Sequence, residues 1–233
     1  MSKGKGRDAD DLVEKYGMDA VIAALGPMMM DERRERLERT LTGRLSGVSV
    51  VLENLTDPHN GGAALRSCEA FGLLSVYIVG QPLRFSERVT QGCEKWLHLE
   101  EHAHIAPLAE KLKQEGRKLY AAVPDAKLPL ESLDPAAPAV FLVGNEHDGL
   151  TDEARSLCDL EYALPMQGFS ESVNLSVATA LTIYTHARRR REHLGRDGDL
   201  DEVELARLRA SYYARSVDGA AAIVRRHLTG RTS

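Results

Sequence analysis

The pattern of apolar and polar positions changes near residue 45 of the 233-residue chain. Before that point, apolar positions recur at helical spacing in short segments that Gly17, Gly26 and Pro27 separate. After it, short runs rich in β-branched residues alternate with segments of helical spacing. The pattern predicts strands at 48–53, 75–80, 97–101, 118–123, 139–144 and 160–164. It predicts helices at 8–17, 18–26, 31–44, 60–72, 105–116, 172–191, 202–216 and 218–228.

Strands that alternate with helices predict an α/β fold, with a mostly parallel sheet covered by helices on both faces. We expect this domain to span residues 46–195, with a helical extension at 1–45 before it and another at 196–233 after it. The proline-rich segment 124–139 is expected to be a surface loop.

Composition is that of an ordinary globular protein, with 43% apolar and 28% charged residues. No apolar run reaches the ~18 residues that a membrane-spanning helix needs, and the polar N-terminus predicts no export signal. Cys68, Cys93 and Cys158 are scattered and form no C-x-x-C pair. We therefore expect buried free thiols in a reducing cytoplasm, without a metal or redox role.

The net charge of −5 argues against a nucleic-acid partner until its distribution is considered. Arginines crowd two stretches: Arg33, Arg34, Arg36, Arg39 and Arg44 in the first, and Arg188–Arg191 with Arg196 in the second. Local positive patches, rather than net charge, attract phosphates. The alternative is that these arginines form solvated helix faces, paired with neighbouring acids such as Glu35, Glu38 and Glu192.

The segment 51–72 combines a strand end, a polar turn, two glycines and a helix. We expect Asn60 to cap the helix, because its side chain can accept from the free N–H groups of the first turn. Gly61 and Gly62 predict close approach of a ligand or a second chain to the backbone. Arg66 follows in an apolar setting, which favours pairing with a carboxylate or a phosphate. The spacing does not match the G-x-G-x-x-G fingerprint of dinucleotide-binding folds.

A second polar segment follows the strand that ends at Gly144. Glu146 comes directly after this buried strand, so it is the carboxylate best placed to meet an arginine. His147 and Asp148 lack a second pair of metal ligands at a useful spacing. We likewise interpret the histidines at 98, 102 and 104 as surface residues rather than zinc ligands.

A third segment, 164–181, leaves a strand through Pro165 and Gly168 and displays Ser172 and Asn174 before a helix of small residues. Open α/β sheets bind their ligands at such strand ends. Backbone groups, a hydroxyl and an amide are available there for binding.

In this order and spacing, the three segments resemble the signature motifs of the SpoU family of RNA 2′-O-ribose methyltransferases, within the SPOUT superfamily. The resemblance covers residues 33–228. The stretches VLENLTDPHN, CEKWLHLE and PMQGFSESVNLSVA, with short helical extensions at both ends, are most similar to the branch that methylates guanosine 18 of bacterial tRNA.

This resemblance implies an α/β fold whose C-terminal part forms a deep trefoil knot. It also implies a homodimer with active sites at the subunit interface, S-adenosyl-L-methionine as methyl donor and tRNA as partner. We expect no metal, because the sulfonium methyl group is already electrophilic, and the composition predicts a cytoplasmic protein with no membrane partner. The positions that match the catalytic residues of the family are Asn60, Arg66, Glu146, Ser172 and Asn174. Backbone groups near the following residues would hold the methyl donor: Ala122, Gly144, Leu164, Met166 and Val173.

Two alternatives stay open. The first keeps the enzyme class and replaces tRNA by ribosomal RNA, although relatives of that kind often carry a larger N-terminal RNA-binding domain. The second is a non-catalytic RNA-binding protein on the same scaffold. Retention of all five catalytic positions argues against it.

Overall fold

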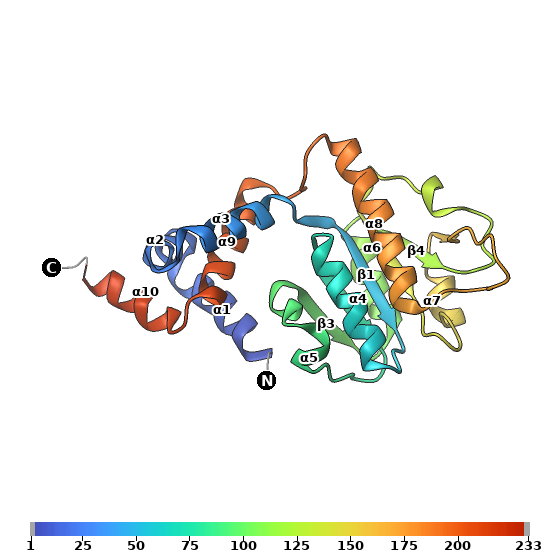
Figure 1. Ribbon diagram of the computed structural model, residues 1–233, viewed down its shortest axis with the longest axis horizontal. Coiled ribbons are helices and arrows are strands. Elements are labelled where there is room, and N and C mark those ends of the chain that lie inside the picture. The colour runs from blue at the N-terminus through green and yellow to red at the C-terminus, as the bar shows by residue number, and fades with distance from the viewer. Residues whose placement is uncertain (1–2, 231–233) are drawn as a thin grey trace. The chain divides into compact units, whose positions relative to one another are not determined.

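The computed structural model describes residues 3–230, which divide into two compact units (Figure 1). The sheet unit comprises Leu45–Asp199. The helical unit combines the described residues up to Arg44 with those from Leu200 onward. The described segments before and after the sheet unit therefore belong to one unit, and the sheet unit is inserted between them in sequence.

The sheet unit is built on a parallel sheet, as the sequence predicts. Within the described residues the sheet has six strands in the order β3-β2-β1-β5-β4-β6. All the pairings are parallel. The strand bounds are β1 Leu45–Glu53, β2 Leu73–Val79, β3 His98–His102, β4 Lys118–Ala122, β5 Ala139–Val143 and β6 Leu160–Tyr162. Strand β1 begins earlier than predicted because Leu45, fully buried, pairs with Leu73.

Helices cover both faces of the sheet (Figure 1). On one face, α4 (Pro58–Ala70) and α8 (Leu175–Leu194) pack together over buried Val50 and Leu52. On the other, α6 (Ile105–Gln114) and α7 (Asp152–Ser156) cover buried Val51. Successive residues of a strand face opposite sides of a sheet, so β1 contributes to both cores. The expected α/β class with both faces covered is confirmed.

The segment 124–139 is more than the surface loop predicted from its prolines. It contains a 3-10 turn, η3 (Leu130–Ser132). Leu130 and Leu133 are buried in the core that α8 covers. Two leucines three residues apart fix the middle of this loop against the sheet unit.

The helical unit contains the predicted terminal helices. Their bounds are α1 Lys3–Tyr16, α2 Met18–Leu25, η1 Gly26–Met28, α3 Asp31–Thr42, α9 Glu202–Ser216 and α10 Ala220–Thr229. Glu38 of α3 accepts from Arg209 Nε at 2.9 Å and from Tyr213 Oη at 2.9 Å, both on α9. Arg44 is buried, with its guanidinium over the Tyr212 ring. Arg44 is therefore not available as the phosphate contact that the sequence suggested.

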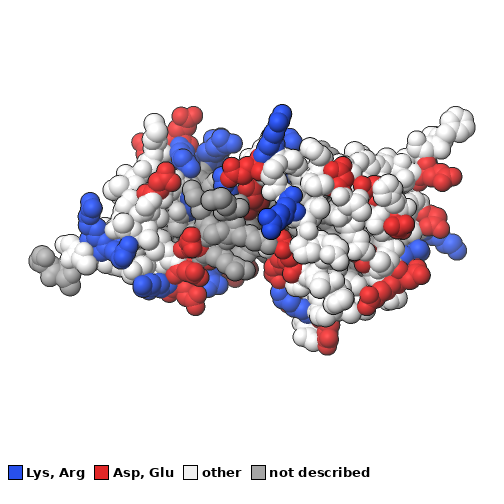
Figure 2. Space-filling view, turned by 90° about the horizontal axis from the view of Figure 1, so that it is seen from below, with Lys and Arg blue, Asp and Glu red and all other residues white. Residues whose placement is uncertain are grey.

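Both units carry basic as well as acidic side chains on their surfaces. Figure 2 shows basic and acidic side chains interspersed on the face that it presents. None of the helices described in residues 3–230 is long and apolar enough to cross a membrane.

Cys68 and Cys93 are buried free thiols, as expected, whereas the free thiol of Cys158 is only half-buried. Burial raises the pKa of Cys93 to about 12, so this thiol stays protonated at neutral pH.

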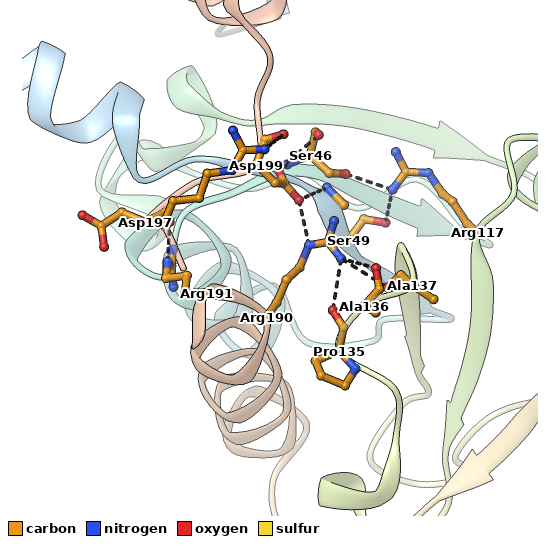
Figure 3. Close-up of polar contacts among 12 residues, drawn as sticks. Ser46, Ser49, Arg117, Pro135, Ala136, Ala137, Arg190, Arg191, Asp197 and Asp199 are labelled. Carbon is orange, nitrogen blue, oxygen red and sulfur yellow. Dashed lines mark hydrogen bonds and ion pairs between the residues drawn. The ribbon is translucent and has the colours of Figure 1, made fainter. Parts of the chain in front are cut away.

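A buried ion pair joins the start of β1 to the end of α8 (Figure 3). Asp199 accepts from the backbone N–H groups of Ser46 at 2.5 Å and Gly47 at 2.9 Å, and from Arg190 Nε at 2.8 Å. Arg190 also donates to the carbonyl groups of Pro135 and Ala136. A Cβ at Gly47 would overlap the guanidinium, so this position requires glycine. The prediction that the run Arg188–Arg191 contacts phosphates is thus wrong for Arg190, because its charge is used inside the protein.

We expect Asp199→Asn to lower the free energy of unfolding by about 3–5 kcal/mol, because it leaves the buried Arg190 guanidinium without a compensating charge. Denaturant titration measures the loss. The matched control is Glu192→Gln, which breaks the exposed pair with Arg188 and should cost less than about 1 kcal/mol. Equal losses in the two variants would contradict a stabilising role of the buried pair.

His186 of α8 is fully buried, and its ring meets Phe141 edge-on with the centroids 4.7 Å apart. Neither ring nitrogen has a hydrogen-bond partner within the described part of the chain. Burial lowers the pKa of His186 from 6.5 to about 4; nearby Arg189 and Arg190 act in the same direction, and Asp134 acts against them. The folded protein therefore holds this imidazole neutral.

This buried imidazole predicts a loss of stability in acid. Below pH 6.5 an unfolded histidine binds a proton that the folded one refuses, so stability falls from about pH 6.5 to pH 4. The full loss is about 3 kcal/mol, on the scale of ~1.4 kcal/mol per pKa unit. His186→Phe should flatten this part of the pH profile in denaturant titrations. An unchanged slope in the variant would exclude His186 as its source.

Candidate active site

The carboxyl ends of β1 and β5 lie side by side at one edge of the sheet. From β1 the chain continues to β2 on one side, whereas β4 and β6 lie on the other side of β5. Such a reversal of strand order opens a crevice at the strand ends, where α/β proteins bind ligands. The segments after β1 and after β5 meet there, although they are far apart in sequence.

A chain of hydrogen bonds joins three of the five predicted catalytic residues. Glu146 Oε1 accepts from Asn60 Nδ2 at 3.4 Å, and Asn60 Oδ1 accepts from Asn174 Nδ2 at 2.9 Å. Thr56 Oγ1 also donates to Glu146, at 3.0 Å. The sequence interpretation missed Thr56, although its place in the loop directly after β1 was a usable signal. Both ends of the Asn60 amide are used, so its orientation is defined by its two partners.

Helix capping positions the two asparagines, but not as the sequence predicted. Helix α4 begins at Pro58, and Asp57 is its cap, with a side chain that accepts from the His59 N–H. Proline favours the first helical position because it has no N–H to leave unsatisfied. Asn60 therefore lies inside the first turn, and its prediction as the cap is wrong. Asn174 is the cap of α8, where its Oδ1 accepts from the Ser176 N–H at 2.8 Å.

A tight turn holds Glu146 at the surface. Asn145 is buried, and its Oδ1 accepts from the backbone N–H groups of His147 and Asp148, both at 2.8 Å. A Cβ at Gly144 would overlap the backbone of Gly149, so the turn closes on itself only with glycine at 144. The turn leads into α7, where Thr151 is the cap and its side chain accepts from the Ala154 N–H.

Arg66 and Ser172 lie outside the hydrogen-bonded chain. Arg66 is exposed on α4, contrary to the apolar setting inferred from its neighbours, because the buried face of α4 consists of other residues: Gly61, Gly62, Ala64, Leu65 and Cys68. It lines a cavity of about 600 Å³ that begins at the same helix turn as Asn60. Ser172 is exposed in the loop between β6 and α8.

The predicted methyl-donor residues follow the ends of neighbouring strands. Ala122 ends β4, Gly144 follows β5 and Leu164 follows β6, and these strands are adjacent in the sheet. Met166 and Val173 lie in the loop from β6 to α8. Met166 is 38% exposed, and Ala122, Leu164 and Val173 are half-buried. The structure thus brings the predicted methyl-donor residues, which are small or apolar, to the carboxyl ends of three neighbouring strands and the loop that follows β6.

Metal ligation is not indicated by the arrangement of residues 3–230. No group of three or more His, Cys, Asp or Glu side chains in this range is placed to hold an ion. His102, one of the histidines considered, lies 3.3 Å from Glu100 Oε2.

Comparison with known proteins identifies the class. The model of the SpoU rRNA Methylase family matches residues 47–184, so the chain belongs to the SpoU methylase family. The tRNA (guanosine(18)-2′-O)-methyltransferase of Thermus thermophilus is 34% identical over 164 residues, which cover 69% of this chain and 84% of that protein. The 23S rRNA (guanosine-2′-O-)-methyltransferase RlmB of Pseudomonas syringae is 31% identical over 169 residues, covering 71% of this chain and 65% of that one.

Solved structures agree with this assignment. The crystal structure of the Aquifex aeolicus TrmH/SpoU tRNA modifying enzyme has a TM-score of 0.71 and 30% identity, and the match covers 80% of this chain and 96% of that one. The SpoU methyltransferase AviRb of Streptomyces viridochromogenes, solved in complex with AdoMet, shares the fold with a TM-score of 0.59 and 22% identity over 65% of this chain and 62% of that one.

We expect Asn174→Ala to act on both the helix and the site. Loss of the cap should cost about 1 kcal/mol of stability, and loss of the bond to Asn60 should lower the rate of methyl transfer at least about tenfold. Asp201→Ala removes the cap of α9 at a similar cost in stability and should leave the rate within about twofold. Equal rates in the two variants would show that the bond to Asn60 has no part in catalysis.

Proposed function

We propose that this protein methylates the ribose 2′-hydroxyl of guanosine 18 in tRNA, with S-adenosyl-L-methionine as the methyl donor. The observation that carries the proposal is the bonded series Glu146, Asn60 and Asn174, which converges from three distant segments on the edge where β1 and β5 end. Catalytic groups are commonly placed at this edge of an α/β sheet. The family and the tRNA-modifying relatives support the reaction class.

The choice of tRNA over ribosomal RNA rests on the extent of the match. The chain covers 84% of the Thermus tRNA enzyme but 65% of the Pseudomonas 23S rRNA enzyme, so more of the latter has no counterpart here. Outside the sheet unit, the chain offers the helical unit for RNA binding. Arg33, Arg36 and Arg39 on α3 are exposed there and could contact phosphates.

In the proposed reaction the ribose 2′-oxygen bonds to the methyl carbon as the sulfur–carbon bond breaks and its electron pair stays with sulfur, and the hydroxyl proton passes to water. S-adenosyl-L-methionine supplies a methyl group that its sulfonium charge already makes electrophilic. The weak nucleophile must lose its proton as it attacks. A guanidinium is a poor general base, so we assign Arg66 the stabilisation of the forming alkoxide and the holding of an adjacent phosphate. Ser172 would contribute a further hydrogen bond to the substrate. The orientation of the substrate would be set by Asn60, Glu146 and Asn174.

We also propose the deep trefoil knot of the superfamily for the C-terminal part of the sheet unit. Two contacts support it. Residue 163, after β6, pairs with the 124–139 loop through a bridge to Pro129 and the bond from the Leu130 N–H to the Ala163 carbonyl. Farther along, Arg189 on α8 donates to the carbonyl of Leu133 in that loop, at 2.7 Å. The chain on both sides of the 164–174 segment is thus held against the same loop.

A homodimer is the assembly that we propose. Helix α8 exposes Val177, Leu181 and Tyr184, which are 44–53% exposed and spaced to lie along one side of the helix. Met166 and Phe169, in the loop that precedes α8, are also exposed. A second copy of this chain, covering these side chains, would border the site beside Asn174. The free cysteines fit the proposed cytoplasmic location.

Labelled methyl transfer tests the proposed function. Protein, labelled S-adenosyl-L-methionine and unmodified tRNA should give a 2′-O-methyl group that maps to guanosine 18, and ribosomal RNA should give none. Arg66→Lys should lower turnover about a hundredfold, because an ammonium cannot reproduce the planar guanidinium. Near wild-type turnover of Arg66→Lys would remove the specific role of the guanidinium. A product found only on ribosomal RNA would replace tRNA as the substrate.

A further inference from the structure

A cationic cavity lies beside the candidate active site. The hydrogen-bonded residues Glu146, Asn60 and Asn174 do not line it. It has a volume of about 600 Å³ and is lined by Arg66, Arg84 and Arg88, together with His59 and Ser86. His59 and Arg66 belong to α4, whereas Arg84, Ser86 and Arg88 belong to the segment between β2 and β3 that contains α5 (Glu87–Thr90). His59 directly precedes Asn60, so the cavity adjoins the catalytic residues along α4.

Two glycines make the cavity possible. A Cβ at Gly61 would lie 2.6 Å from the Phe85 ring, and a Cβ at Gly62 would overlap the Val89 side chain. The close approach predicted for Gly61 and Gly62 is therefore made by the protein's own segment, rather than by a ligand or second chain. Because Phe85 and Val89 pack directly on α4, the arginines at 84 and 88 line one cavity with Arg66.

The three arginines differ from the others of the sheet unit. Every other arginine of Leu45–Asp199 donates to a carboxylate or a backbone carbonyl: Arg117, Arg155, Arg188, Arg189, Arg190, Arg191 and Arg196. Within the described residues, Arg66, Arg84 and Arg88 have no such partner, and no carboxylate lines the cavity. The carboxylate of Asp57 is used at the start of α4, where it accepts from the His59 N–H. Guanidinium groups without a neighbouring carboxylate are suited to bind the anionic oxygens of a ligand.

We propose that Arg84 and Arg88 bind the backbone phosphates that flank the target nucleotide, and so place its ribose next to Arg66 and Asn60. This inference rests on the proposed function, since it names the part of the RNA that the cavity holds. Arg84 and Arg88 are positioning residues: they neutralise phosphate charge and fix the strand. Planar guanidinium groups suit this task because each can bind two phosphate oxygens at once.

The first experiment compares Arg84→Ala/Arg88→Ala with a control that loses the same charge elsewhere. Lys111→Ala/Lys113→Ala removes two exposed cations from α6, on the opposite face of the sheet. We expect the arginine variant to raise the KM for tRNA at least about tenfold. The slope of log affinity against log salt should become shallower by about one to two, with the affinity for S-adenosyl-L-methionine unchanged. The control variant should stay within about twofold of the wild type in all three measurements.

The second experiment changes the RNA instead of the protein. A neutral methylphosphonate linkage on either side of guanosine 18 should weaken binding to the wild-type protein about tenfold, and binding to the arginine variant less than about twofold. Thermal shifts with inorganic phosphate test whether a free anion is the ligand. Stabilisation of the wild type alone by inorganic phosphate, with no effect of the neutral linkage, would overturn the assignment to RNA.

An arginine variant that binds tRNA as tightly as the lysine control would also overturn the proposal. The salt dependence of tRNA affinity and the methylphosphonate comparison need no turnover, unlike the KM, so these two measurements decide the role of the cavity even if labelled methyl transfer detects no product. That absence of product would instead refute the proposed function.

Discussion

Parallel pairing of β1 with β5 is the constraint on which the site depends. Parallel strands end at the same edge of a sheet, so the pairing brings the loop after Glu53 and the loop after Val143 together across about ninety residues of sequence. The pairing of the two strands is therefore sufficient to bring the polar groups of both loops together. The buried Glu53 carboxylate joins the same two loops a second time, because it accepts from the N–H and the hydroxyl of Thr151. The site is thus a consequence of sheet topology, completed by short polar side chains.

The strands and most helices were predictable because their apolar positions alternate with the period of the element that they form. The site was predictable only in part. Glu146 follows a strand end, where α/β proteins commonly place functional groups. Asn174 directly precedes a helix, and there its structural role as the cap of α8 coincides with its bond to Asn60. The cap of α4 was misassigned because Asp57 and Asn60 are both good capping residues, and only the position of Pro58 in the helix decides between them.

Tertiary contacts determined what the sequence left open. The burial of Arg190 depends on Asp199 and on the carbonyl groups of residues 135–137, none of which is indicated by a run of four arginines. Conversely, the sequence does not indicate a binding role for Arg84 and Arg88, because they are isolated in a polar segment. Their proximity to Arg66 follows from Gly61 and Gly62, whose missing side chains admit Phe85 and Val89. Of the three arginines that line the cavity, only Arg66 was indicated by the sequence as a phosphate contact.

Helix α8 links a buried ion pair to the candidate site. It is 20 residues long, about 30 Å at ~1.5 Å per residue. Its first turn is capped by Asn174, which holds Asn60, and its last turns carry Arg190, which holds Asp199. A helix of this length is rigid along its axis, so a shift of the Arg190 end moves the Asn174 end with it. The buried pair costs desolvation energy that an apolar contact would avoid. The buried pair and the 2.9 Å bond between Asn174 and Asn60 are both made by α8, so both depend on the position of this helix along its axis.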